Sequence, residues 1–164
     1  MRVVIKPGKK TTKIIGVISD THGLVRPEAL RALKGADLLI HAGDIGSPEV
    51  IEALKSIASV VAVRGNIDTD EWACDLPETE VVEFGDVLIY VLHDVMKLDL
   101  DPGKAGICAV ISGHSHRPLI TKRNGVLFLN PGSAGPRRFS LPIAIARLRV
   151  KGASVDAKVV ELNV

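Results

Sequence analysis

The chain has 164 residues, of which 46% are hydrophobic and only 3% aromatic. That length supports one domain with a sizeable core, and the core must consist mainly of Val, Ile, Leu and Ala. The formal net charge of +2 comes from scattered Lys and Arg residues, which argues against a dedicated nucleic-acid surface.

The N-terminus and the cysteines indicate a reducing, cytoplasmic setting. Residues 1–12 are basic and lack the apolar segment of a signal peptide. No apolar run reaches the roughly 20 residues of a membrane-spanning helix, so no membrane association is expected. Cys74 and Cys108 form no CxxC motif, and Cys108 is expected in the core. We predict a basic extension at 1–12, either frayed or added as an edge strand, before a single domain at 13–164.

Strand and helix patterns alternate in the first part of the chain. The expected elements are strands at 13–19, 37–41 and 59–63 and helices at 27–35 and 47–57. The strands are apolar throughout, as is typical of parallel strands covered on both faces. Each helix has Pro in its first turn, and Ser47 is the expected N-cap of the second. This βαβαβ order predicts right-handed crossovers.

The second part of the chain favours hairpins. They are expected at 80–84 with 87–92, at 119–123 with 126–129 and at 143–150 with 154–162. A short helix at 98–105 and a buried strand at 107–111 lie between the first two. The helices are too few to cover all hairpins on both faces. The economical α/β architecture is a four-layer αββα sandwich, in which two mixed β-sheets pack together with flanking helices.

Five of the predicted strands end in side chains that can bind metal ions. These side chains are Asp20, His22, Asp44, Asn66, His93, His114 and His116. Ligands bind beyond the carboxyl ends of the strands in an open α/β sheet. We therefore expect all seven on one rim of one sheet.

The donor set favours two divalent ions over one. Seven nitrogen and oxygen donors without a thiolate exceed the needs of one tetrahedral ion. Asp44 follows the central strand of the βαβαβ unit and is the natural bridging carboxylate. Imidazole and carboxylate ligands suit Mn, Fe, Zn, Co or Ni better than Ca. Two such ions would activate water for in-line displacement at phosphorus, so phosphoester hydrolysis is favoured, while carboxyl or amide hydrolysis stays open.

The order of these segments resembles a known family. Asp20-Thr21-His22, Gly43-Asp44, Gly65-Asn66, His93 and Gly113-His114-Ser115-His116 are similar to the signature blocks of the calcineurin-like metallophosphoesterases, in particular the small YfcE-type phosphodiesterases. Asn130-Pro131-Gly132-Ser133 matches a further segment of that subgroup.

The resemblance implies the αββα fold of the metallo-dependent phosphatases and assigns the donors to two ions. It places Asp20, His22, Asp44 and His116 on one ion, and Asp44, Asn66, His93 and His114 on the other. It implies a phosphodiesterase in which a hydroxide bridging the metals attacks a small phosphodiester, with catalytic roles for Asp44, Asn66 and His114. Mn is the preferred metal, with Ni, Mg, Fe, Zn or Co as alternatives, and a homo-oligomer is compatible.

Two positions depart from the family pattern. Larger members carry a histidine after the asparagine, where this chain has Ile67. A general acid typically contributes roughly 10²–10⁴-fold in rate, so we expect slow turnover that is best with good leaving groups. His93 is followed by Asp94-Val95 instead of the Gly-His common in the family, which leaves the substrate contacts there open.

Simpler roles compete for several residues. Asp20, Asp44 or Asn66, taken singly, could cap a turn. His41 is either a satisfied core histidine or a residue that orients a ligand, and Asp68 either bonds a ligand or turns the chain. Arg64, Arg117, Arg137 and Arg138 could hold phosphate oxygens, although solvated arginines are commoner. Trp72 and Phe139 are interpreted as packing residues.

The second function hypothesis is a non-catalytic scaffold. The implied fold is similar to that of the retromer subunit Vps29, which serves as a protein-interaction platform and whose branch lacks one ligand histidine. All seven donor positions are filled here, which favours the enzyme.

Overall fold

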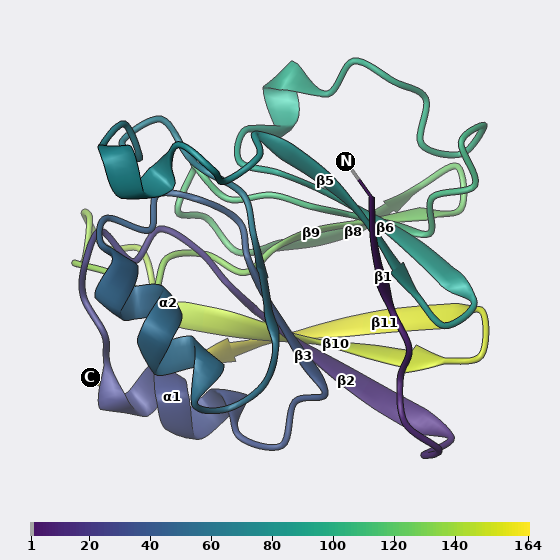
Figure 1. The fold of residues 1–164 in the computed structure, drawn as a ribbon, viewed down its shortest axis with the longest axis horizontal. Coiled ribbons are helices and arrows are strands. Elements are labelled where there is room, and N and C mark those ends of the chain that lie inside the picture. Colours follow the sequence, from purple (N-terminus) through teal and green to yellow (C-terminus); the bar gives the residue numbers. More distant parts are fainter. Residues whose placement is uncertain (1) are drawn as a thin grey trace.

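The computed structural model describes residues 2–164, and its strands form two sheets that pack face to face (Figure 1). The six-stranded sheet has the order β1 (Arg2–Ile5), β5 (Thr79–Phe84), β6 (Val87–Leu92), β7 (Ala109–Ile111), β9 (Val126–Asn130) and β8 (Leu119–Arg123). The five-stranded sheet has the order β11 (Ser154–Glu161), β10 (Ala144–Lys151), β2 (Thr12–Ile18), β3 (Leu38–His41) and β4 (Val60–Ala62).

Both sheets mix parallel and antiparallel pairs. In the five-stranded sheet, β2, β3 and β4 are parallel, as the βαβαβ pattern predicts, and the hairpin of β10 and β11 adds antiparallel to β2. In the six-stranded sheet, β7 is parallel to its neighbours β6 and β9. β5 pairs antiparallel with β6, and β8 pairs antiparallel with β9. The three predicted hairpins are confirmed.

The main core lies between the sheets. It consists of aliphatic side chains that alternate along the strands, such as Ile15 and Val17 on β2 and Ile89 and Val91 on β6. Apolar surface removed from water contributes roughly 25 cal/mol per Å², so this layer supplies the largest favourable contribution to folding.

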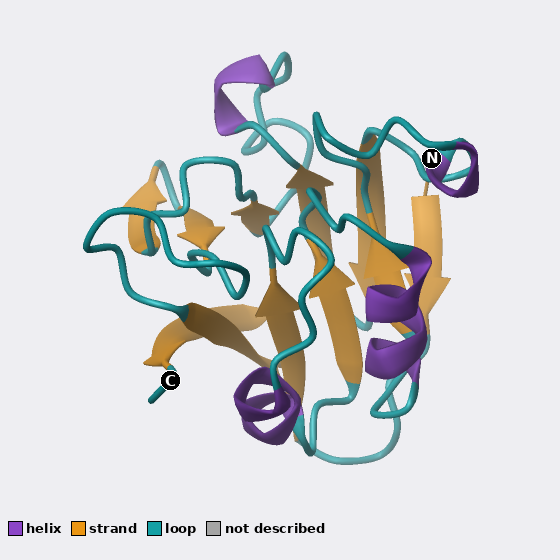
Figure 2. Ribbon diagram, turned by 90° about the vertical axis from the view of Figure 1, so that its left-hand side faces the viewer, coloured by secondary structure: helices purple, strands orange, loops and turns teal. Residues whose placement is uncertain are grey.

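The outer face of the five-stranded sheet is covered by helices α1 (Pro27–Leu33) and α2 (Pro48–Lys55), as Figure 2 shows. Each begins at its proline, which is favourable because the first helical N–H needs no partner. Ser47 stands at the N-cap of α2, but its side chain makes no capping hydrogen bond. Within residues 2–164, no helix has the length and apolar character needed to cross a membrane.

The outer face of the six-stranded sheet is covered by a loop. The predicted helix at 98–105 is wrong: the only helical turn nearby is η2 (Val95–Lys97), a 3-10 turn, and turns follow at 102–106. Pro102 and Gly103 both disfavour a helix interior. A second 3-10 turn, η1 (Glu71–Ala73), lies between β4 and β5. The predicted sandwich of two mixed sheets is otherwise confirmed.

The basic N-terminus forms an edge strand, which was one of two alternatives. β1 pairs parallel with β5, with Arg2 opposite Val81, at the border of the six-stranded sheet. Cys108 is only partly buried, although it packs against the main core. The division of the chain into an extension at 1–12 and one domain stays a prediction.

Candidate metal centre

Polar side chains meet where strands of both sheets end. The ends of β2, β3 and β4 in the five-stranded sheet carry Asp20, His22, Asp44 and Asn66. The ends of β6 and β7 in the six-stranded sheet carry His93, His114 and His116. The expectation of one rim on one sheet is therefore wrong. The donors come together because the sheets pack with these ends at the same side of the sandwich.

Left-handed backbone conformations concentrate in this cluster. Five of the seven predicted donors adopt them, with φ of 55° at Asp20, 48° at His22, 55° at Asp44, 70° at His114 and 62° at His116. Among the other non-glycine residues of 2–164, only Asn124 and Phe139 do so. Such conformations cost roughly 1–3 kcal/mol each and persist where the surrounding structure holds them, typically at functional sites.

Asp20 presents one carboxylate oxygen to the cluster. Its Oδ2 accepts hydrogen bonds from Ser19 Oγ at 2.7 Å and the backbone N–H of His114 at 3.0 Å. Its Oδ1 lies 3.3 Å from His116 Nε2 and 4.0 Å from His22 Nε2. Asp20 Oδ1 and His22 Nε2 are buried, and neither has a hydrogen-bond partner. Buried polar atoms are normally satisfied, so these two atoms fit a site at which a cation binds.

Asp44 lies between two histidines, one from each sheet. Its Oδ1 accepts the backbone N–H of Ile67 at 3.0 Å, and its Oδ2 lies 3.3 Å from His93 Nε2 and 3.7 Å from His22 Nε2. The ring of His93 is oriented by a bond of 2.8 Å between Nδ1 and the carbonyl of Ala42, which leaves Nε2 to face the cluster. One oxygen of Asp44 therefore lies close to metal-binding nitrogens from both sheets.

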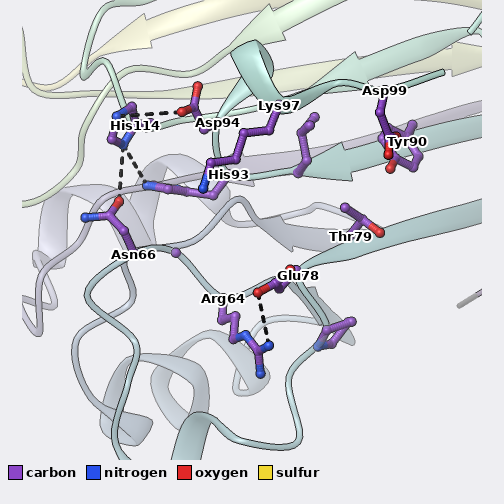
Figure 3. A pocket seen from close by; sticks show the side chains of 13 residues that line it. Arg64, Asn66, Glu78, Thr79, Tyr90, His93, Asp94, Lys97, Asp99 and His114 are labelled. Carbon is purple, nitrogen blue, oxygen red and sulfur yellow. Dashed lines mark hydrogen bonds and ion pairs between the residues drawn. The ribbon is translucent and has the colours of Figure 1, made fainter. Parts of the chain in front are cut away.

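Asn66 and His114 complete the cluster on its open side. His114 Nδ1 lies 3.2 Å from Asn66 Oδ1 and 3.3 Å from His93 Nε2, so three donor atoms converge (Figure 3). On the far side of the ring, His114 Nε2 lies 4.0 Å from Asp94 Oδ2. A carboxylate at that position can orient a metal-binding imidazole, a role that the sequence did not suggest for Asp94.

Two glycines leave room for the buried carboxylates of Asp20 and Asp44. A Cβ at Gly65 would overlap the carboxylate of Asp44, and a Cβ at Gly113 would overlap Ser19 and Asp20. These contacts explain why the donor loops carry glycine at these two positions.

His41 proves to be a satisfied buried histidine that also joins two donor loops. Its Nδ1 accepts the backbone N–H of Gly43 at 3.1 Å, so the proton is on Nε2, which lies 2.9 Å from Thr21 Oγ1. The Thr21 hydroxyl in turn donates to the carbonyl of Ile45 at 2.8 Å. Burial is the main cause that lowers the pKa of His41 to about 3, so the ring is neutral at physiological pH.

Asp68 ties the loop of Asp44 to the loop of Asn66. Its Oδ2 accepts the backbone N–H groups of Gly65 at 2.8 Å and Ile45 at 3.1 Å, and its Oδ1 accepts that of Gly46 at 3.0 Å. The side chain is buried, with 5% of its residue surface exposed. It therefore positions donor loops, which goes beyond turning its own segment.

Replacing Asp68 with alanine should destabilise the metal-free protein by about 2–4 kcal/mol, because one buried and two partly buried N–H groups lose a charged acceptor. Urea unfolding of chelated protein measures the change. Asp70, exposed in the same segment, is the matched control, and its replacement with alanine should change the free energy of unfolding by less than about 0.5 kcal/mol. Equal stabilities of the two variants would contradict this role.

The end of β9 and the residues that follow it support two of the donor loops. Asn130 Nδ2 donates to the carbonyl of Gly113 at 2.9 Å and to Ser115 Oγ at 3.1 Å. Ser133 Oγ donates to the carbonyl of Asp20 at 3.0 Å. The family resemblance included this segment, but only the structure shows what these side chains contact.

Burial and charge act against each other at the donors. Burial lowers the pKa of His93, but the Asp44 carboxylate and the Ala42 carbonyl raise it by more, so the net shift is upward. Burial raises the pKa of Asp44, but His93 and the Ile67 N–H lower it by more. Burial lowers the pKa of His116, and Asp20 opposes this only in part. Asp44 is thus held ionised, as binding of a cation requires.

The donor atoms form two overlapping groups of metal-binding size. One contains Asp20, His22 and His116, the other contains Asp20, Asp44 and His93, and the atoms within each lie within 4.8 Å of one another. In this geometry Asp20 is common to both groups, whereas the sequence pointed to Asp44 as the shared carboxylate. Asp44 Oδ2 nevertheless lies within 4.0 Å of histidines from both groups. Nitrogen and oxygen donors without sulfur fit divalent transition metals.

The other candidate residues lie outside this cluster. Arg64 pairs with Glu78 at 3.2 Å, and Arg137 donates to the carbonyl of Leu141 at 3.1 Å. Arg117 and Arg138 are exposed. Trp72 packs against the helix-covered core as expected, but Phe139 does not pack and is 91% exposed.

Comparisons with known proteins agree with this geometry. Residues 14–153 match the model of the calcineurin-like phosphoesterase superfamily domain. A protein of Methanocaldococcus jannaschii named probable metallophosphoesterase is 38% identical, and the match covers 93% of this chain and 83% of that protein.

Solved structures share the fold. One described as a novel archaeal phosphodiesterase is 25% identical, with a TM-score of 0.74 over 90% of this chain and 99% of that one. Vacuolar Protein Sorting 29 of Cryptosporidium parvum is 24% identical, with a TM-score of 0.78 over 94% of this chain and 93% of that one. At that identity, the second likeness concerns the fold alone.

Proposed function

We propose that this chain, which belongs to the calcineurin-like phosphoesterase superfamily, hydrolyses phosphodiesters with the help of two divalent metal ions. The observation that carries the proposal is the buried pair Asp20 and Asp44, whose oxygens face histidine nitrogens from both sheets. The structural likeness to an archaeal phosphodiesterase supports diesters as the substrate class.

The residues divide between two positions. Asp20, His22, Asp44 and His116 would hold one ion, and Asp44, Asn66, His93 and His114 the other. When bound, such ions supply Lewis acidity that activates water and offsets negative charge at phosphorus. We propose Mn as the native metal, because the mixed imidazole, carboxylate and amide donors suit it, with Ni, Mg, Fe, Zn and Co as alternatives.

The protein's own groups supply orientation and charge. The Ala42 carbonyl fixes the ring of His93, and Asp94 Oδ2 lies 4.0 Å from the outer nitrogen of His114, where it favours binding of a cation by this ring. Asn66 and the half-exposed His114 lie at the open side, where a phosphate can approach. Ile67 can donate no proton to a departing alkoxide, so substrates with acidic leaving groups should react fastest.

Metal removal and restoration test the proposal. Chelated protein should cleave neither bis-p-nitrophenyl phosphate nor p-nitrophenyl phosphate, and Mn should restore cleavage of the diester above that of the monoester. Ni, Mg and Zn are compared in parallel, and Mn should also raise the melting temperature because it binds only the folded state.

A pair of variants distinguishes hydrolysis at the proposed site from hydrolysis by a contaminating enzyme. His116→Ala should lose the metal-dependent activity. Asp86→Ala is the matched control, since Asp86 is exposed in the β5–β6 turn at the far end of β6 from His93. Absence of hydrolysis with every metal would contradict the enzyme and leave the scaffold as the remaining hypothesis, which protein-partner searches would then address.

A further inference from the structure

A cleft of about 700 Å³ opens beside only one half of the candidate metal centre. Its lining includes Asn66, His93 and His114, but not Asp20, His22 or His116. Clefts of this size hold ligands much larger than a phosphate. One substituent of a bound diester would thus have a walled binding place beside this half.

The far end of the cleft is formed by the paired strands β5 and β6 and the segment after η2. Thr79 lies opposite Leu92 in the sheet, and Tyr90 precedes Leu92 on the same side of β6. In Figure 3, Thr79, Tyr90 and Asp99 stand apart from Asn66, His93 and His114, with the cleft between them. Pro77 and Leu92 contribute apolar groups to the wall of the cleft. The lining therefore offers apolar surface together with hydroxyl and carboxylate groups.

The charges of the lining disfavour an anionic substituent. The cleft has two cationic side chains, Arg64 and Lys97, against three carboxylates, Glu78, Asp94 and Asp99. Arg64 is already paired with Glu78 at 3.2 Å. A second phosphate would need a surplus of cations, and the carboxylates would repel it. Carboxylates and hydroxyls instead accept hydrogen bonds from alcohol groups.

We propose that this cleft binds one substituent of the phosphodiester and that this substituent is an uncharged, hydroxylated ring such as a ribosyl or glycosyl unit. The ring would pack against the apolar wall that includes Pro77, and the hydroxyls would bond with Thr79, Tyr90 and Asp99. The inference rests on the proposed phosphodiesterase function, because it assumes that the phosphate binds between Asn66, His93 and His114.

Three diesters with the same p-nitrophenyl group test the inference on the Mn-loaded protein. They carry methyl, choline or the 5′-oxygen of thymidine as the second substituent. The thymidine diester should show a kcat/KM at least about tenfold above that of the methyl diester. Equal values for these two, or the highest value for the choline diester, would overturn the inference while leaving the phosphodiesterase intact. Cleavage of none of the three would overturn the phosphodiesterase and the inference together.

Conservative variants test whether the preference for the thymidine diester arises in this cleft. The double variant Thr79→Val and Tyr90→Phe removes two hydroxyls without changing side-chain size greatly, and it should lower the thymidine-to-methyl ratio of kcat/KM by about tenfold. Thr121→Val, on β8 and outside the cleft lining, is the control and should keep the wild-type ratio. An unchanged ratio in the double variant would overturn the assignment of this cleft.

A glycosyl source is distinguished from a nucleoside by a fourth diester, in which a glucosyl unit replaces thymidine. Preference for either one over methyl supports the proposed class, and the stronger preference identifies the source.

Discussion

Replacing Asp44 with alanine should abolish metal binding at both positions and lower diester hydrolysis by at least about 10³-fold. The Oδ2 atom lies 3.7 Å from His22 Nε2 and 3.3 Å from His93 Nε2, between donors assigned to different ions. Loss of this carboxylate removes a ligand from each ion and leaves His93 without its ionic partner. Lewis-acid stabilisation is worth several kcal/mol, and each 1.36 kcal/mol changes the rate tenfold.

Metal stoichiometry is the decisive measurement for Asp44. Chelated protein is reloaded with Mn, dialysed and analysed by elemental analysis, with wild type expected near two ions per chain and Asp44→Ala near zero. Asp86→Ala controls for loss of a surface carboxylate and should bind as wild type does. Retention of one ion by Asp44→Ala would contradict the shared role and favour Asp20, the carboxylate common to both donor groups.

Replacing Ile67 with histidine should accelerate hydrolysis of diesters with poor leaving groups by about 10²-fold. Ile67 lies directly at the centre, because its backbone N–H donates to Asp44 Oδ1 at 3.0 Å, and its side chain is 42% exposed. Because Ile67 is not enclosed by the core, an imidazole can be accommodated at this position. A protonated histidine there would give a departing alkoxide the proton that isoleucine cannot supply.

The dependence on the leaving group distinguishes this effect from a general change in binding. The acceleration is measured as kcat/KM for diphenyl phosphate and for bis-p-nitrophenyl phosphate, and it should be large for the first and small for the second. Ile67→Asn, polar but unable to act as an acid, should accelerate neither. Equal acceleration of both substrates would contradict proton donation from position 67.

The seven candidate donors could be found from the sequence because each follows directly on an apolar strand. Strand period and turn residues are local signals, and they were sufficient for the three hairpins and the βαβαβ unit. The predicted helix at 98–105 was wrong because its pattern was weak, and Pro102 with Gly103 favoured turns in this segment.

Other parts of the site could not be predicted from short segments of the sequence. The sequence left two roles open for Asp68 and for His41, and only the structure shows that each joins segments about 20 residues apart in the chain. Asp94 was noted only as a departure from the family pattern, and its place beside His114 depends on two different loops. The cleft at β5 and β6 had no signature at all.

The sequence by itself determined which side chains have metal-binding chemistry and that they follow strands, because side-chain chemistry and strand boundaries are properties of short segments. Only the tertiary structure decided that the donors come from two sheets, that Asp20 and Asp44 share the histidines, and that a cleft lies on one side. Those features are distances between segments far apart in the chain. They are set by how the two sheets pack around their common core, which no single segment encodes.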